Sequence, residues 1–130
     1  MELITNRTYA DVLLGNSKGV YSWEDLNRVE QAVDTLSRQA AEAGIVFQPA
    51  VKLDWAEPGA FDIQQWPVQS QMRRYLQNVK DLCSAVGVTA RLPQSMEKLT
   101  WEGANQIERA LLAVYTKLQR TQVTGEEETV

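Results

Sequence analysis

Two groups of residues with the same types and spacing are the strongest candidates for chemistry in this sequence. Trp23, Asn27 and Glu30 recur 78 positions later as Trp101, Asn105 and Glu108. Steps of four and three residues place each trio along one flank of an α-helix. Their amide and carboxylate groups can bond the backbone of a connector that passes the helix, with the tryptophan closing the core. Alternatively, each trio is a partner-binding surface, since tryptophan is favoured in interface hot spots.

Other residues offer less chemistry. The chain has no histidine, which removes the commonest general base and transition-metal ligand. Glu24, Asp25 and Glu30 fit helix capping and solvated helix charge better than acid–base catalysis, which needs one carboxyl with a selectively raised pKa. Cys83 falls at an apolar helix position and is interpreted as a buried structural thiol. We therefore expect no enzyme activity and no cofactor.

Metal and nucleic-acid sites are also disfavoured. Asp54, Glu57 and Asp62 do not have the spacing of an EF-hand loop, so no metal site is expected. A modest basic face is better explained by solvation or an acidic partner than by DNA; it comprises Arg73, Arg74, Lys80 and Arg91. The net charge is −4, and three of those charges lie in Glu126–Glu128. The body is thus near neutral, which argues against a nucleic-acid surface.

Length and composition predict one domain. With 130 residues the chain can bury a core without disulfides or structural metal ions, and its single cysteine excludes an internal disulfide framework. No apolar run approaches the roughly 20 residues of a membrane span, and the beginning lacks a signal-peptide pattern. We expect a soluble protein made inside the cell, with a helical domain over residues 1–120 and a flexible acidic tail over 121–130.

The repeat itself predicts two helix starts. Residues 22–32 and 100–110 share the pattern [ST]-W-E-x-[LA]-N-x-[VI]-E-x-A. Ser22 and Thr100 are good N-cap residues, and Glu24 and Glu102 place negative charge in the first turn. Apolar residues at three- and four-residue steps then predict helices from about Trp23 to Ala43 and from about Trp101 to Arg120.

Two further helices complete the prediction. The 3-4 apolar spacing from Pro67 to Val86 predicts the middle helix, with Ser70 or Val68 at its start, and a short helix is expected over residues 9–14. The fold class is therefore all-α: a small bundle of three main helices and a short N-terminal one, with long ordered connectors. The repeat suggests a pseudo-twofold relation between its two helices.

The connector after the first long helix should be extended and then form a loop. Val51, Leu53 and Trp55 alternate with charged residues, but no second convincing strand is available to pair with them. Phe61 and Trp66 lie in the loop that follows, and with Trp55 they form a possible docking loop. Within that loop, three large apolar residues favour an ordered conformation; they are Phe61, Ile63 and Trp66.

An ordered set of short motifs resembles a family of small structural proteins of phages and prophages of Firmicutes. Leu26–Val33 is similar to the L-N-x-I-E-x-A-I element of tail-fibre and baseplate proteins. Further elements follow in the same order from about Thr5 to Leu118; they are Asn16–Gly19, Asp54-Trp55, Trp66-Pro67 with Met72–Val79, Ser95–Thr100 and Glu102–Glu108. Two departures are Val68, where the family often has a threonine cap, and a shorter connection after the first short helix.

The resemblance implies a non-enzymatic tail or baseplate component located in the virion and made in the host cytoplasm. Its expected partners are other tail or baseplate proteins and further copies of itself in a symmetric ring, without nucleic acid or membrane. The expected docking surfaces are the outer parts of the trios, the aromatic loop and the acidic tail. The alternative is a soluble cytoplasmic helical adaptor or regulator encoded in a mobile element. An assembly subunit should leave an apolar patch open, whereas an adaptor should hide it.

Overall fold

A computed structural model describes residues 1–57 and 67–128 of the chain, with side chains as far as Arg120. Its helices are α1 (Tyr9–Leu14), α2 (Trp23–Glu42), α3 (Gln69–Val86) and α4 (Trp101–Glu128). The described residues contain no strand, which confirms the all-α class with three main helices and a short N-terminal one. None of these helices is long and apolar enough to span a membrane.

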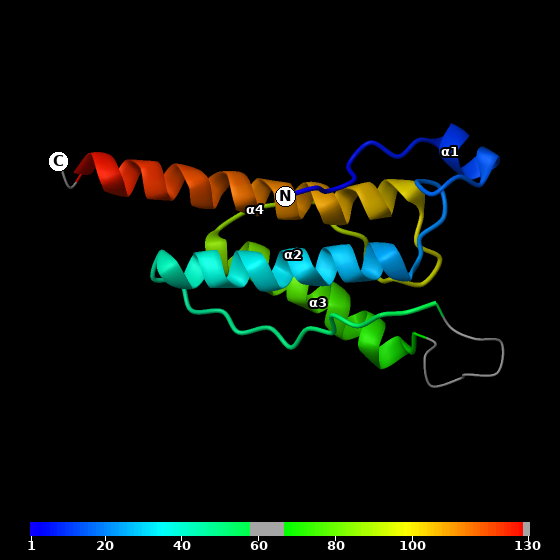
Figure 1. The fold of residues 1–130 in the computed structure, drawn as a ribbon, viewed down its shortest axis with the longest axis horizontal. Helices are drawn as coiled ribbons and strands as arrows, with labels where there is room; N and C mark the ends of the chain where they lie inside the picture. The colour runs from blue at the N-terminus through cyan, green and yellow to red at the C-terminus, as the bar shows by residue number, and fades with distance from the viewer. Residues whose placement is uncertain (58–66, 129–130) are drawn as a thin grey trace.

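The three long helices run in the same direction, from right to left in Figure 1. Parallel neighbours need long connections, because the chain must return to the starting end before each new helix. Residues 43–57 and 87–100 belong to such connections and are largely without regular structure. The first eight residues run back along the bundle in the same way before α1. Each of α2, α3 and α4 contacts the other two.

The core lies where the apolar stripes of the three long helices meet. Leu36, Leu82 and Leu111 are fully buried, one from each helix. Trp55, with 4% of its surface exposed, adds a large aromatic side chain from the connector. Cys83 is also buried in this cluster, and burial raises the pKa of its thiol. The helical periodicity of the sequence therefore identified the core faces correctly.

The helix starts follow local capping chemistry. Thr100 Oγ1 accepts the Gly103 N–H at 3.0 Å, as expected for an N-cap. Ser22 occupies the N-cap position of α2, but the main bond there runs from its backbone N–H to Asp25 Oδ2, at 2.7 Å. Val68 caps α3, and Gln71 Oε1 accepts its N–H, so the helix starts at Gln69 and Ser70 is not its cap.

The last helix is longer than predicted. The sequence suggests an end near Arg120, because apolar periodicity stops there, yet α4 continues to Glu128. No proline interrupts residues 121–128. Once a helix is established, each further residue adds a backbone hydrogen bond at little cost. Extension does not require an apolar face, and this is the signal on which the sequence-based boundary relied.

Candidate functional site

Asn27 and Glu30 on α2 bind the connector that follows this helix. Asn27 Nδ2 donates to the Trp55 carbonyl at 2.7 Å, and Asn27 Oδ1 accepts the Trp55 N–H at 2.9 Å. Glu30 accepts the Lys52 N–H at 3.1 Å and the Trp55 indole N–H at 2.5 Å. Two side chains thus satisfy three backbone groups of an extended segment that has no strand partner within the part of the chain that the structure describes. We call this arrangement the α2 clamp.

Asn105 and Glu108 on α4 bind the first residues of the chain in the same manner. Asn105 Oδ1 accepts the Arg7 N–H, and Asn105 Nδ2 donates to the Arg7 carbonyl, both at 3.0 Å. Glu108 accepts the Ile4 N–H at 3.0 Å and an Arg7 guanidinium N–H at 2.7 Å. Asn105 is 1% exposed and Glu108 is 0% exposed. We call this arrangement the α4 clamp.

The two clamps correspond bond for bond. In each, the asparagine amide binds both backbone groups of one connector residue. The glutamate then accepts the backbone N–H three residues earlier and a side-chain N–H of the residue that the asparagine holds. This is why Asn and Glu recur at the same spacing in the sequence. The pseudo-twofold axis itself stays a prediction.

Each glutamate also binds an arginine from a neighbouring helix. Arg74 of α3 donates to both oxygens of Glu30, at 2.5 and 3.1 Å. Arg28 of α2 donates to both oxygens of Glu108, at 2.7 and 2.9 Å. Bidentate arginine–carboxylate pairs are among the stronger and more directional hydrogen-bonded contacts. Each clamp therefore joins one connector and two helices.

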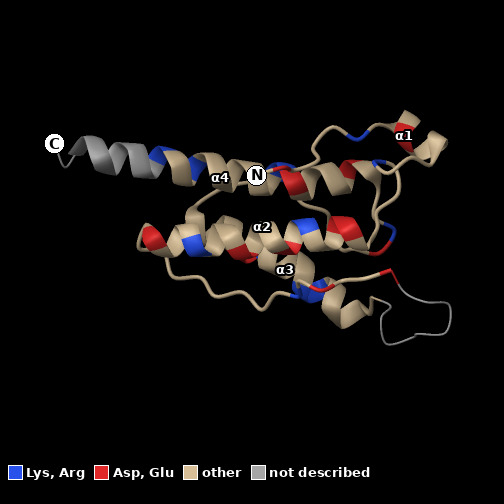
Figure 2. Cartoon of the chain, viewed as in Figure 1, with Lys and Arg blue, Asp and Glu red and all other residues tan. Residues whose placement is uncertain are grey.

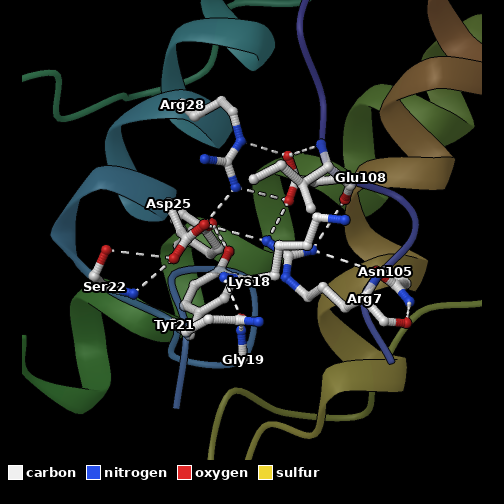
Figure 3. A network of polar contacts seen from close by, with 12 residues as sticks. Arg7, Lys18, Gly19, Tyr21, Ser22, Asp25, Arg28, Asn105 and Glu108 are labelled. Carbon is white, nitrogen blue, oxygen red and sulfur yellow. Dashed lines mark hydrogen bonds and ion pairs between the residues drawn. The ribbon is translucent and has the colours of Figure 1, made fainter. Parts of the chain in front are cut away.

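The α4 clamp extends into a buried charged network, shown in Figure 3. Arg7 lies between Glu108 and Asp25, with its guanidinium 3.2 Å from Asp25 Oδ1. Arg28 bridges the same two carboxylates. Two cations face two anions, which offsets the cost of removing these charges from water. Burial alone would lower the pKa of Arg28, but the hydrogen bonds to Glu108 and Asp25 raise it above its ordinary value.

A pair of phenols closes this network on the side of α3. The Tyr21 and Tyr75 hydroxyls are hydrogen-bonded to each other, and the Arg7 guanidinium lies 5.6 Å from the centre of the Tyr21 ring. Burial raises the pKa of Tyr21, and the negative charges of Glu108 and Asp25 raise it further. Burial likewise raises the pKa of Tyr75. Both phenols are therefore held in the neutral form.

This arrangement is suited to positioning segments of the chain. The carboxylates of Glu30 and Glu108 each accept several hydrogen bonds and pair with arginine. Each carboxylate is thereby fixed to one connector and to an arginine of a neighbouring helix. Among the described residues, no group of three or more metal-ligating side chains is close enough to hold a metal ion. What the clamps do is hold two extended segments in fixed register.

The tryptophans of the trios take less part than the asparagines and glutamates. Trp23 is half-buried and packs against the core, and Trp101 is half-buried beside Ala90 and Arg91. The sequence predicts Trp55 in a docking loop, but Trp55 is a core residue, since the α2 clamp turns its ring inward. Phe61 and Trp66, expected in the same loop, lie outside the described residues.

Sequence reasoning missed the arginines that complete the clamps. Arg7 lies in a short lead with no helical periodicity, yet it is 3% exposed. Arg28 immediately follows Asn27, and a helical wheel gives no reason to direct it toward α4. For Arg74 the sequence predicts a place on a basic face, whereas its guanidinium binds Glu30. One signal was available: a buried helical glutamate needs a cationic partner, so each predicted clamp required an arginine from elsewhere.

An exposed apolar projection lies next to the α4 clamp. Five large apolar residues on α1 and the loop after it are exposed to solvent; they are Tyr9, Val12, Leu13, Leu14 and Val20. None of the residues of α1 is buried. The helix stands at the upper right of Figure 1, and Asp11 is its single charged residue (Figure 2). We call this feature the α1 knob.

The knob has a closely hydrogen-bonded base. Asp11 accepts the Thr8 N–H at 2.9 Å and an Asn16 side-chain N–H at 2.8 Å, and the Asn16 bond contributes most to lowering the pKa of Asp11. Asn16 Oδ1 accepts the Gly19 N–H at 3.0 Å. A β-carbon on Gly19 would lie 2.1 Å from the Asp11 carbonyl oxygen, so only glycine fits there. These bonds fix the shape of the knob without burying its apolar surface.

Comparisons of the chain with protein-family models, with curated proteins and with solved structures find no match to any of them.

Proposed function

We propose that this chain is a non-enzymatic structural protein of a phage or prophage tail, which assembles with other tail or baseplate proteins. The ordered resemblance of its motifs to small phage structural proteins supports the setting. The α1 knob is the main observation that supports docking to a partner protein as the mode of action. Five large apolar side chains on and beside a short exposed helix are unfavourable in water, and such patches mark protein interaction sites.

The clamp architecture supports the same proposal by explaining how the knob is presented. Asn105 binds the backbone of Arg7, and the next residue, Thr8, is the N-cap of α1. The α4 clamp therefore fixes the point from which the knob projects. Asn16 and Gly19, at the base of the knob, belong to one of the motifs that carry the resemblance. A surface held in place before binding loses less conformational entropy when a partner covers it.

Incorporation into particles tests this proposal. Leu13 and Leu14 are 70% and 76% exposed, so Leu13→Asp/Leu14→Asp should fold normally and yet lower incorporation at least tenfold. Val46→Asp is the matched control, because Val46 is 85% exposed and lies on the connector after α2. Tagged variants expressed with the native chain would be quantified in gradient-purified particles. Equal incorporation of the knob variant and the control would contradict docking through the knob.

A further inference from the structure

The first half of α3 and residues 94–97 enclose a cleft of about 490 Å³, here named the α3 cleft. Its apolar lining includes Met72, Leu76 and Met96. Arg73 and Lys80 also line it, and neither makes an ion pair with a residue that the structure describes. Glu97 is the one acidic lining residue, and it already accepts a bond from Gln69 at 2.9 Å.

The charge of the cleft is opposite to that of the chain as a whole. The protein carries −4, whereas the cleft lining has two basic residues and one acidic residue. The densest acidic sequence is Glu126-Glu127-Glu128, at the end of α4. A cleft with an apolar lining, and with cations that have no ion-pair partner among the described residues, is suited to bind such a segment, because the cations can pair with the carboxylates.

The acidic end of α4 cannot reach the cleft of its own chain. Residues 94–97 lie just before α4, which then runs for 28 residues to Glu128. At a rise of about 1.5 Å per residue, the helix carries its acidic end roughly 40 Å away. In Figure 1, α3 begins at the lower right and α4 ends at the far left. The occupant must therefore come from another molecule.

We propose that the α3 cleft of one copy binds the acidic end of α4, Glu126–Glu128, of a second copy. The contact joins two different surfaces at opposite ends of the molecule, so it is head-to-tail. Repeated contacts of this type build a ring if the rotation closes and a filament if it does not. This inference adds a self-assembly contact to the proposed tail function, but it depends on different residues from the knob.

The test measures the mass of the full-length chain by size exclusion with light scattering, over rising concentration at low salt. The native chain should form species larger than a dimer, and 0.5 M NaCl should weaken them because it screens exposed charges. Two variants remove one side of the contact each: Glu126→Gln/Glu127→Gln/Glu128→Gln, and Arg73→Glu/Lys80→Glu. Each should raise the self-association Kd roughly tenfold or more, as expected for the loss of about two exposed ion pairs.

Mixing provides the sharper result. Each variant retains one competent side, so an equimolar mixture should form dimers and stop there. Combining Arg73→Glu/Lys80→Glu with Glu126→Lys/Glu127→Lys/Glu128→Lys in one chain should restore the larger species. Arg38→Glu/Arg91→Glu, with the same charge change outside the cleft, should behave as the native chain.

Three results would overturn the proposal. A native chain that stays monomeric at every concentration at low salt would do so. Association that survives both variants would also overturn it. So would association that is lost in Leu13→Asp but retained when Glu126–Glu128 are neutralised, because the cleft would then bind the α1 knob or another segment. If Arg73→Glu/Lys80→Glu misfolds, Glu126→Gln/Glu127→Gln/Glu128→Gln still tests the contact. Detection of the chain in particles alongside any of these results would leave the tail function standing and reject only this contact.

Discussion

Asn105 binds both backbone groups of Arg7, a residue 98 positions away in the sequence, through two hydrogen bonds of 3.0 Å. The pair brings the beginning of the chain against the last helix. Asn27 binds Trp55 in the same way. Extended segments without strand partners leave backbone groups that must be satisfied if they are buried. In this protein, side chains of the repeated helices satisfy them.

Asn27→Ala and Asn105→Ala should each lower the free energy of unfolding by roughly 1–3 kcal/mol, the usual cost of leaving buried backbone groups unpaired. Urea denaturation measures the change. Asn78→Ala is the control, because Asn78 makes one exposed bond to the Ala50 carbonyl; it should cost about 0.5 kcal/mol or less. If both clamp variants were as stable as the native chain, the clamps would not organise the fold.

Glu108→Gln should cost more, roughly 3–5 kcal/mol, because it leaves the buried Arg7 guanidinium with an unbalanced charge. Arg28 would lose the same anionic partner. Arg38→Gln is a surface comparison: Arg38 pairs with Asp34 but is 74% exposed, so its loss should cost no more than about 1 kcal/mol. Chemical denaturation of both variants gives the comparison, and similar costs would argue that the network does not stabilise the protein.

Stability should fall at alkaline pH because of the two buried phenols. Burial raises the folded-state pKa of Tyr21 and Tyr75 above the ordinary value of 10.0. Above about pH 10 the unfolded chain loses phenolic protons that the folded chain retains, so the free energy of unfolding decreases as pH rises. The contribution is fully present below that pH. Urea denaturation at pH values from about 8 to 11 measures this effect. The free energy of unfolding should decrease less with pH in Tyr21→Phe/Tyr75→Phe than in the native chain. An equal decrease in both proteins would assign the effect to other groups.

Gly19→Ala should disturb the α1 knob while leaving the bundle folded. Its β-carbon would meet the backbone of Asp11 at 2.1 Å, so the loop and α1 must separate. Hydrogen exchange of residues 9–14 should become faster, whereas exchange in α2 and α4 should be unchanged. Ser17→Ala, in the same loop, is the control. Unchanged exchange in α1 would mean that Gly19 does not fix the knob.

The sequence predicted the helices well because local signals define them. N-cap residues at positions 22 and 100 and the 3-4 apolar spacing gave the starts and buried faces of α2 and α4. The repeat also pointed to the four clamp side chains, and the asparagine of each copy binds one connector residue in the same way.

What the sequence could not supply were the partners of those side chains. The bond from Asn105 to Arg7 and the pair of Arg74 with Glu30 join elements far apart in the chain, so no local pattern encodes them. Trp55 was misplaced for a related reason. Alternation showed an extended segment but not which face it turns toward the bundle, and the bonds to Asn27 and Glu30 decide this.

The proposed role in the tail is tested most simply by quantitative mass spectrometry of particles purified through a density gradient from a culture that encodes this chain. A tail component should co-purify with known tail proteins, in several copies per particle and in constant ratio across the particle peak. A chain that is abundant in the soluble lysate and absent from that peak would contradict a structural role in the tail and favour the cytoplasmic adaptor.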